Sequence, residues 1–292
     1  MTAPDALPRL IVRHPELSDS QLAAFTAALG RPPERRDARV AAWPAVPMGR
    51  DEVVRLADAA GVDAALVPAD LSLADFRLAA FDMDSTLITI ECVDEIADYI
   101  GRKAEVAAIT EAAMRGEIAD YDESLRRRVA LLAGLPETTL QQVWDERVRL
   151  TPGAERLVGA LKAAGLKILL VSGGFTFFTD RLKAHLGIDF AQSNVLEVSD
   201  GRLTGGLVGR IVNAQGKREA LEHNCRQIGC SPAQAIAVGD GANDLEMMGV
   251  AGISVAYRAK PLVRAQTTWA IDHGGLDTLL DWLPARAASS SR

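Results

Sequence analysis

The feature that most constrains the fold is an alternation of short apolar runs with helical segments, which begins near residue 75. The runs are RLAAF, LKILLVSGG, QAIAVGDG, GISVA and TWAID. Nearly continuous apolar runs of this length are expected of parallel strands that are buried on both faces and joined by crossover helices. Asp200 and Gly201 lie between alternating residues and predict a β-hairpin. The sequence therefore predicts an open, mostly parallel α/β sheet with a hairpin insertion.

Two regions depart from this alternation. From Val93 to about Leu150 the sequence has only helical patterns, such as VDEIADYIG and YDESLRRRVALLAG. We expect this helical insertion, at about 90–150, to lie as a lid over the carboxyl ends of the strands, where open α/β proteins bind ligands. Residues 1–74 are expected to form a separate small α/β domain, with RPPERRD as a loop, and 75–292 the main domain. The C-terminal AASSSR is expected to be disordered.

Composition excludes several classes of protein. The formal net charge of −7 argues against nonspecific binding to nucleic acid. No apolar run approaches the roughly 20 residues of a membrane span, and the first residues do not resemble a secretory signal. Cys92, Cys225 and Cys230 have the spacing of neither a disulfide framework nor a zinc site, and the histidines form no metal-ligand pattern. We therefore expect a cytoplasmic protein without nucleic-acid or membrane partners.

Polar residues gather where the apolar runs end. They are Asp82 and Asp84 after the first run, Ser172 and Gly173 after the second, Lys217 at a predicted helix start, and Asp240, Asn243 and Asp244 after the third. Because the carboxyl ends of parallel strands meet at one rim of a sheet, these groups are expected to converge. Asp82 and Asp84 alone could equally lie on a solvated turn, but the whole set indicates a chemical site.

This set of side chains suits phosphoryl transfer to a carboxylate. Asp82 and Asp240 offer the oxygen ligands that Mg²⁺ prefers. Ser172 and Lys217 could neutralise phosphoryl oxygens, the positioning on which such transfers mostly depend. Asp82 would then attack phosphorus and form an aspartyl-phosphate. Asp84 would protonate the leaving oxygen and later deprotonate the attacking water.

The segments FDMDSTL, VSGGF and GDGANDLEM, with Lys217 between the last two, resemble the motifs of the haloacid dehalogenase (HAD) superfamily of phosphatases. Over residues 77 to about 283 the chain is most similar to the phosphoserine phosphatase family. The resemblance implies a Rossmann-like core and Mg²⁺-dependent hydrolysis of O-phospho-L-serine in serine biosynthesis. It assigns the nucleophile to Asp82, the acid/base to Asp84, phosphate contacts to Ser172, Gly173 and Lys217, Mg²⁺ to Asp82, Asp84 and Asp240, and supporting roles to Asn243 and Asp244.

The resemblance also implies how the lid would recognise an amino acid. Glu91 would bind its ammonium group, and Arg128 would bind its carboxylate. From the residues alone, Glu91 is equally explained as an acid at a helix N-terminus, and Arg128 as part of a solvated basic stripe. Met114 and Tyr121 would line the pocket by resemblance, but packing within the lid explains them equally well.

Other functions stay open at this point. The same site could pass the phosphoryl group to another alcohol, such as homoserine, or the chain could be a receiver that is phosphorylated on aspartate, or a binding protein. An acid/base such as Asp84 argues against the receiver, because a lasting phospho-signal has no use for it. Longer relatives carry ACT-like regulatory modules, so serine feedback through residues 1–74 is a hypothesis, and a homodimer is a further expectation.

Overall fold

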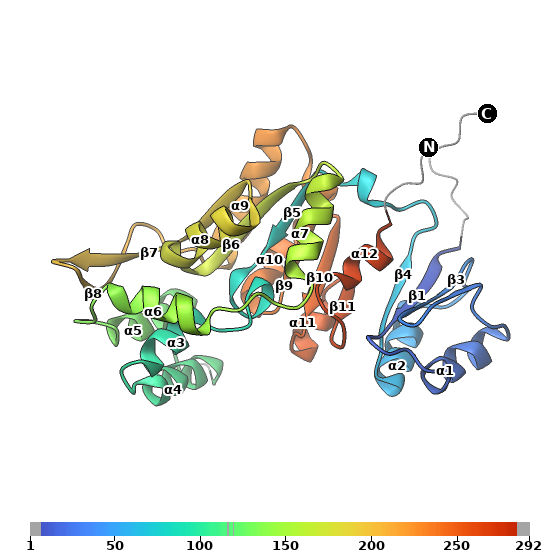
Figure 1. Cartoon of the computed structure of the whole chain (residues 1–292), viewed down its shortest axis with the longest axis horizontal. Helices are drawn as coiled ribbons and strands as arrows, with labels where there is room; N and C mark the ends of the chain where they lie inside the picture. Colours follow the sequence, from blue (N-terminus) through green and yellow to red (C-terminus); the bar gives the residue numbers. More distant parts are fainter. Residues whose placement is uncertain (1–6, 116, 119, 285–292) are drawn as a thin grey trace.

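The computed structural model describes residues 7–115, 117–118 and 120–284. Within these residues the chain forms a four-stranded sheet of order β2-β3-β1-β4 and a seven-stranded sheet of order β11-β10-β9-β5-β6-β7-β8. The small sheet lies at one end of an elongated molecule, and the helical insertion lies at the other (Figure 1). The predicted fold class is thereby confirmed: an α/β core with a mostly parallel sheet, a helical cap and a small N-terminal α/β unit. The predicted disorder of AASSSR falls outside the described residues.

The N-terminal unit has the element order β-α-β-β-α-β. Its elements are β1 (Arg9–Arg13), α1 (Asp19–Leu29), β2 (Arg35–Arg36), β3 (Val40–Trp43), α2 (Arg50–Ala60) and β4 (Asp63–Val67). β1 pairs antiparallel with both β3 and β4, which gives a ferredoxin-like arrangement. Ser18 caps α1 with a capping box, as its position before an apolar helix suggests. The prediction that RPPERRD is only a loop is wrong, because β2 pairs with β3; two exposed arginines carry no apolar pattern that could reveal a strand.

The large sheet follows the predicted alternation. Its strands are β5 (Leu78–Phe81), β6 (Lys167–Phe175), β7 (Phe190–Ser199), β8 (Arg202–Val208), β9 (Ala235–Gly239), β10 (Ile253–Tyr257) and β11 (Trp269–Ile271). Among these described strands, every neighbouring pair is parallel except β7 and β8. Asp200 and Gly201 join β7 to β8 with φ angles of 50° and 72°, the positive values that a tight hairpin turn requires. The predicted hairpin is confirmed.

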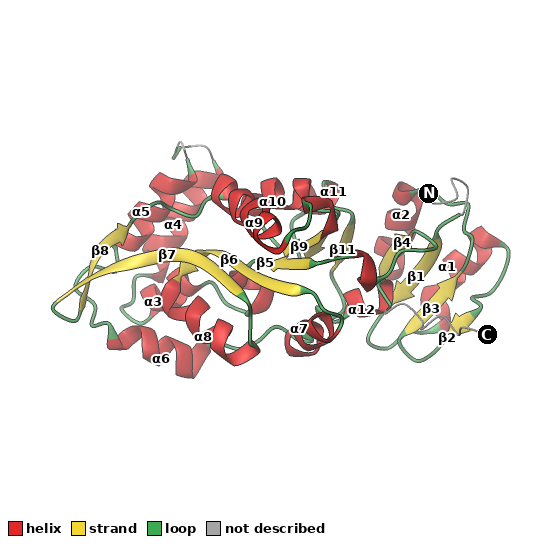
Figure 2. Cartoon of the chain, turned by 90° about the horizontal axis from the view of Figure 1, so that it is seen from above, coloured by secondary structure: helices red, strands yellow, loops and turns green. Residues whose placement is uncertain are grey.

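Helices cover both faces of this sheet (Figure 2). One face carries α7 (Ala154–Ala163), α8 (Thr176–Leu186) and α12 (Thr278–Trp282), and the other carries α9 (Ala214–Ile228), α10 (Leu245–Val250) and α11 (Pro261–Ala265). Alternate residues of β5 enter the two cores, with Ala79 and Phe81 on one side and Leu78 and Ala80 on the other. Burial on both faces explains why this strand reads as a continuous apolar run.

The predicted helical insertion leaves the sheet after β5 and returns before β6. We call its helices the cap: α3 (Cys92–Asp98), α4 (Lys103–Met114), α5 (Tyr121–Ala130) and α6 (Thr138–Arg147). The two chain segments that connect the cap to the core pair with each other. Thr89 N donates to the Arg149 carbonyl at 3.0 Å, and Thr151 N donates to the Leu87 carbonyl at 2.9 Å. The loop between α5 and α6 also bonds to the β7–β8 hairpin, where Gly134 N donates to the Leu203 carbonyl and Leu203 N to the Leu135 carbonyl, both at 2.8 Å, so the cap is held to the core at this second place as well.

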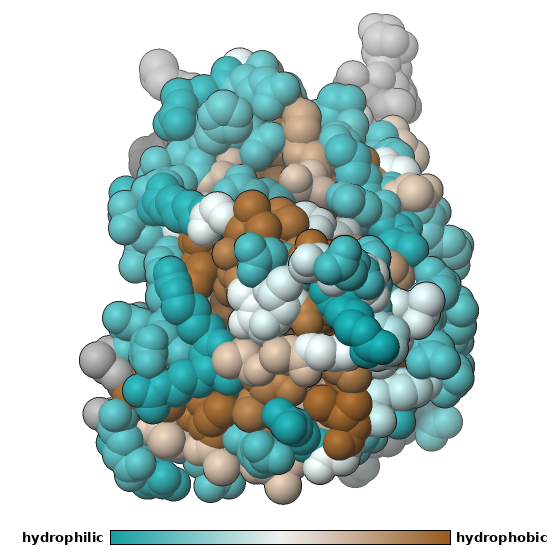
Figure 3. All heavy atoms as spheres, turned by 90° about the vertical axis from the view of Figure 1, so that its left-hand side faces the viewer, coloured by the Kyte–Doolittle hydropathy of each residue, from teal (hydrophilic) through white to brown (hydrophobic). Residues whose placement is uncertain are grey.

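The hairpin at the cap end exposes apolar side chains. Val195, Val198 and Val208 are 41%, 39% and 54% exposed, and Val195 lies opposite Val208 in the β7–β8 pair. Figure 3 faces this end of the molecule and shows apolar residues among hydrophilic ones. None of the described helices is long and apolar enough to cross a membrane.

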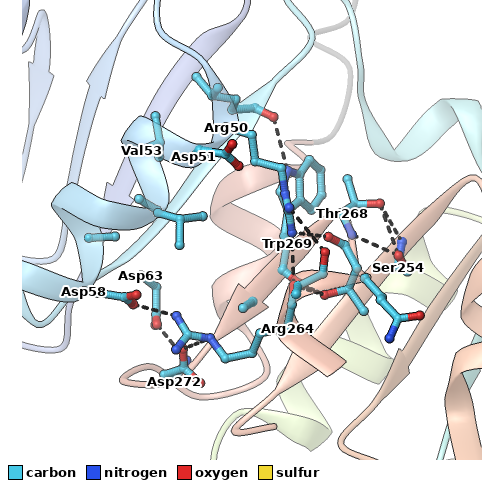
Figure 4. A pocket seen from close by; sticks show the side chains of 18 of the residues that line it. Arg50, Asp51, Val53, Asp58, Asp63, Ser254, Arg264, Thr268, Trp269 and Asp272 are labelled. Carbon is cyan, nitrogen blue, oxygen red and sulfur yellow. Dashed lines mark hydrogen bonds and ion pairs between the residues drawn. The ribbon is translucent and has the colours of Figure 1, made fainter. Parts of the chain in front are cut away.

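The N-terminal unit contacts the β11 edge of the core, and an arginine from each part bonds to the other part (Figure 4). Arg50 of α2 donates to the carbonyls of Arg264 and Thr267 at 3.0 and 2.7 Å. Arg264 in turn pairs with Asp58 of α2 at 2.6 Å and with Asp272 at 3.1 Å. A cavity of about 820 Å³ at this interface is lined by residues of both parts, among them Arg50, Asp58 and Arg264.

A buried carboxylate fixes the same interface. Asp63, at the start of β4, is 1% exposed and accepts hydrogen bonds from the backbone N–H groups of Asp272, His273 and Gly274 at 2.7, 3.0 and 2.7 Å. Arg13 of β1 is 4% exposed, and its Nε donates to Asp281 at 3.3 Å. Because these charged groups are satisfied across the interface, the N-terminal unit is docked on the core rather than joined to it only by the chain.

Candidate active site

The site begins at the turn that follows β5. Asp82 is 4% exposed, and its backbone N–H donates to the Val238 carbonyl of β9 at 3.0 Å, so its position is set by the sheet. Ser85 adopts a left-handed φ of 54° and reverses the chain, and Ile88 N closes the turn on the Met83 carbonyl at 3.0 Å. This tight turn holds Asp82 and Asp84 at the carboxyl rim of the sheet, as predicted.

Lys217 joins two of the predicted acids. Asn213 caps α9, which places Lys217 in the first helical turn. Its Nζ lies 2.7 Å from Oδ1 of Asp82 and 2.7 Å from Oδ1 of Asp244. The side chains of Lys217 and Asp244 are fully buried. Burial alone would lower the pKa of Lys217, but the two carboxylates raise it above its usual value, so the ammonium keeps its charge.

Three carboxylates of the rim form one group. Asp82, Asp240 and Asp244 each offer an oxygen, and these oxygens lie within 4.8 Å of one another. Burial and the neighbouring Asp244 charge raise the pKa of Asp240 to about 7, and the same two causes raise the pKa of Asp82 well above its usual value. Oxygen ligands that repel one another in this way fit a hard divalent cation, which would relieve the repulsion. The carboxylate of Asp84 does not belong to this group.

Asp84 has the environment of an acid. Its Oδ1 is buried and has no hydrogen-bond partner in the described part of the chain. Burial, followed by the nearby charge of Glu91, raises the pKa of Asp84 to about 8, so the carboxyl group is protonated at neutral pH. A Cβ on Gly174 would lie only 2.9 Å from Oδ2 of Asp84 and 3.1 Å from Oγ of Ser172. The absence of a side chain at Gly174 therefore lets β6 bring Ser172 next to Asp84.

Ser172 and Gly173 are held at the end of β6. Ser172 is 1% exposed, and its Oγ accepts from Gly174 N at 2.8 Å, which leaves the hydroxyl hydrogen free to donate. The buried Asn194 donates to the Gly173 carbonyl at 2.7 Å and accepts from Val212 N at 2.8 Å. Asn194 thus ties the β6 end to the segment that leads into α9.

Three of the predicted site residues, Tyr121, Glu91 and Arg128, come from the cap and from the segment that leads into it. The Tyr121 hydroxyl lies against Gly173, and burial raises the pKa of Tyr121 to about 12, so the phenol stays neutral. Glu91 accepts from Ser85 Oγ at 2.7 Å. Arg128 lies close enough for its charge to lower the pKa of Glu91, although desolvation raises that pKa overall. No ion pair involving Arg128 is found among the described residues, and its Nε donates to the Ser124 carbonyl at 3.4 Å, which leaves the terminal nitrogens of the guanidinium for a ligand.

The remaining predicted residues are placed less fully. Asn243 is partly buried, and its Oδ1 lies against Gly241. Nothing is described of the Met114 side chain. Tyr121, Glu91 and Arg128 from the cap thus face the same rim as the acids of the core.

Sequence reasoning missed several groups that support this site. Thr86 donates to Oδ1 of Asp240 at 3.2 Å, and Asn213 donates to Asp122 of the cap at 3.0 Å. Asn194 was also missed. The hydroxyls directly after Asp84 in DSTL were a usable signal for Thr86, whereas nothing in the sequence links Asn194 to Gly173, 21 residues earlier.

Comparison with known proteins agrees with this geometry. Residues 76–252 match the model of the haloacid dehalogenase-like hydrolases. A phosphoserine phosphatase of Polaromonas sp. is 66% identical over 216 residues, which cover 73% of this chain and 92% of that protein. The solved structure of a probable phosphoserine phosphatase from Vibrio cholerae has a TM-score of 0.81 and 39% identity, and the match covers 94% of this chain and 86% of that one.

A further solved structure, a phospho-aspartyl intermediate analogue of phosphoserine phosphatase, has a TM-score of 0.67 and 38% identity over 71% of this chain and 99% of its own. The residues that match the family model, 76–252, include the strands and turns that carry the acids described above. This chain therefore belongs to the phosphoserine phosphatases of the haloacid dehalogenase superfamily of hydrolases.

Proposed function

We propose that the protein hydrolyses O-phospho-L-serine to L-serine and orthophosphate through an aspartyl-phosphate on Asp82, as the last step of serine biosynthesis. The observation that carries the proposal is the pairing of two neighbouring carboxyl groups with different environments. Asp82 contacts the Lys217 ammonium and belongs to the carboxylate cluster, whereas Asp84 lies apart from that cluster, with its Oδ1 buried and without a partner among the described residues. One group is suited to attack and the other to donate a proton. The relative captured as a phospho-aspartyl intermediate analogue supports the same chemistry.

The phosphoryl group would be held at the carboxyl ends of β6 and β9. In this arrangement the Ser172 hydroxyl, the Gly173 amide and the Lys217 ammonium contact its oxygens. Asp82, Asp84 and Asp240 would hold Mg²⁺, with Asp244 and Asn243 in support. A bound Mg²⁺ neutralises charge between the carboxylates and the phosphoryl oxygens. Asp84 as a metal ligand stays a prediction, because its carboxylate lies apart from the cluster of three.

The reaction takes two steps. A carboxylate oxygen of Asp82 attacks phosphorus, the bond from phosphorus to the seryl oxygen breaks, and Asp84 gives its proton to that oxygen, so L-serine leaves. Asp84, now a carboxylate, accepts a proton from a water molecule that attacks the aspartyl-phosphate. The bond from phosphorus to Asp82 then breaks, and orthophosphate is formed with Asp84 protonated again.

The cap supplies recognition of the amino acid. Glu91 would bind the substrate's ammonium group, and Arg128 would bind its carboxylate. The two side chains are near enough for their charges to interact, yet they form no ion pair within the described residues, which leaves room for a zwitterion between them.

A phosphate-release assay tests the proposal. O-phospho-L-serine should be hydrolysed in Mg²⁺ and not in EDTA, and faster than phosphoethanolamine, which lacks the carboxylate. Adding homoserine shows whether the phosphoryl group passes to another alcohol, because phosphate release would then fall while serine release continues. Absence of phosphate release from phosphoserine in Mg²⁺ would overturn the proposal.

Further proposals concern the whole chain. Residues 1–74 would form a small ACT-like regulatory domain, and 75–292 the catalytic domain with its cap at about 90–150. Equal inhibition by L-serine of the full chain and of a chain starting near residue 75 would remove the regulatory role. We also propose a cytoplasmic location, which fractionation tests. Sedimentation tests a homodimer, to which the exposed valines of the β7–β8 hairpin could contribute.

A further inference from the structure

Asn213 bonds to two helices at once. It caps α9, where its Oδ1 accepts from Gly216 N at 3.0 Å, and this bond starts the helix that carries Lys217. Its Nδ2 donates at 3.0 Å to Oδ1 of Asp122, which lies in the first turn of α5. One side chain therefore joins the core helix that holds Lys217 to the cap helix that carries Arg128.

The bond to Asp122 is the one that needs an amide at this position. Aspartate caps a helix as well as asparagine does, but a carboxylate has no hydrogen to donate. Arg210 lies close enough to Asp122 for their charges to interact, yet its guanidinium bonds to Glu219 at 2.6 and 3.2 Å. No ion pair of Asp122 is found in the described part of the chain, so Asn213 is the group that holds this carboxylate.

The same bond closes a ring of contacts around Gly173. On the core side, Asn194 donates to the Gly173 carbonyl at 2.7 Å and accepts at 2.8 Å from the backbone N–H of the residue before Asn213. On the cap side, the residue before Asp122 is Tyr121, whose hydroxyl lies so close to Gly173 that a Cβ would have no room there. Core and cap therefore meet at the phosphate end of the site both through the Tyr121 hydroxyl and through Asn213.

The first turn of α5 also sets the place of Arg128. Tyr121 and Arg128 are seven residues apart, about two helical turns, so both project from the same face of α5. We propose that Asn213 is a positioning residue, which holds α5 through Asp122 for recognition of the substrate. It fixes the distance from the phosphate site at Gly173 to the carboxylate site at Arg128. This proposal rests on the proposed function, and it adds a residue of the core to the recognition that the cap supplies.

Exchanging the two partners tests this role. Asn213→Asp keeps a capping side chain on α9 but sets two carboxylates against each other, so the first turn of α5 should move away. The KM for phosphoserine should rise about tenfold, the effect of losing one charge-assisted hydrogen bond, while kcat changes little because the acids and Lys217 of the core keep their places. The double variant Asn213→Asp/Asp122→Asn returns a donor to the pair in the opposite direction, so it should recover most of the rise in KM.

Gln215→Glu provides a matched control. It adds the same charge to the first turn of α9, on an exposed side chain that bonds to Glu219 rather than to the cap. This variant should leave both KM and kcat as they are.

Three results would overturn the proposal. The first is an unchanged KM in Asn213→Asp, including the case in which only its urea midpoint falls, because Asn213 would then have a purely structural role. The second is a double variant with a KM as high as that of the single variant. The third is a fall in kcat at constant KM, since the added charge would then act on Lys217. Absence of any hydrolysis of phosphoserine by the unsubstituted protein would instead refute the proposed function itself.

Discussion

Replacement of Lys217 by Met tests whether this ammonium balances the buried acids of the site. Lys217 is fully buried, and its Nζ lies 2.7 Å from both Asp82 and Asp244. Removing one partner of a buried ion pair costs about 3–5 kcal/mol of unfolding free energy. Proton uptake sets an upper limit on this loss, because the carboxylate cluster of the folded variant can bind one more proton in place of the ammonium. Binding that proton at pH 7 costs about 1.4 kcal/mol for each pH unit above the pKa of an unfolded aspartate, about 3.9, which gives about 4 kcal/mol in total.

The loss of unfolding free energy in Lys217→Met should depend on pH in one direction. The extra proton is bound by the folded variant and not by its unfolded chain, so the variant gains stability relative to the unsubstituted protein as pH falls. The loss should therefore shrink from about 4 kcal/mol at pH 7 to about 1.5 kcal/mol at pH 5. Urea unfolding in EDTA at the two pH values measures it.

Lys167→Met is the matched control. Its Nζ lies 2.7 Å from Asp189, the same distance as in the buried pairs, but the lysine side chain is 53% exposed. An exposed pair contributes up to about 1 kcal/mol, so this variant should lose little at either pH. A loss in Lys217→Met that equals the control, or that is the same at pH 5 and pH 7, would refute the assignment of Lys217 as the balancing charge.

Four further outcomes are expected. Asp82→Asn should abolish phosphate release while keeping the circular dichroism spectrum, and substantial residual turnover would contradict its role as nucleophile. Asp84→Asn should still bind substrate but lose roughly two to four orders of magnitude in kcat, the usual scale of acid/base catalysis. An unchanged kcat would exclude Asp84 as the acid/base. Arg128→Ala should reduce kcat/KM for phosphoserine far more than for phosphoethanolamine, whereas equal losses would make it a surface charge. Asp63→Ala, which leaves three backbone N–H groups unpaired, should lower the unfolding free energy by about 3–5 kcal/mol, and an unchanged urea midpoint would contradict this.

The strands of the core could be predicted because each carries its signal locally. β5, β9 and β10 are buried at every position, so their apolar runs stand out from the helices around them. The acids were predictable for the same reason, since a charged residue directly after a fully buried strand is conspicuous. Convergence of Asp82, Lys217 and Asp244 followed from the parallel connection of these strands.

What could not be predicted depends on pairs of residues far apart in the chain. Asn194 in the middle of β7 has no local sign that it holds the Gly173 carbonyl. Asp63 reads as a polar residue at a strand start, and its three acceptor bonds to 272–274 are 209 to 211 residues away. Tyr257 and Arg258 read as the end of an apolar run, because a buried hydroxyl without a partner and a left-handed backbone are properties of the folded chain.

The contacts of Asp63 also connect the N-terminal unit with the cap. Asp63 holds the loop at 272–274, and two residues later Leu276 N donates to the Pro152 carbonyl at 2.8 Å. Residues 151–152 belong to the segment that returns from the cap, where Thr151 N pairs with the Leu87 carbonyl of the outgoing segment. Coupling between distant sites is carried by such continuous chains of contacts. If this series of contacts couples the N-terminal unit to the cap, Asp63→Ala should change the KM for phosphoserine under conditions where the variant is fully folded. If the role of Asp63 is purely local, the substitution should lower the unfolding free energy and leave the KM unchanged.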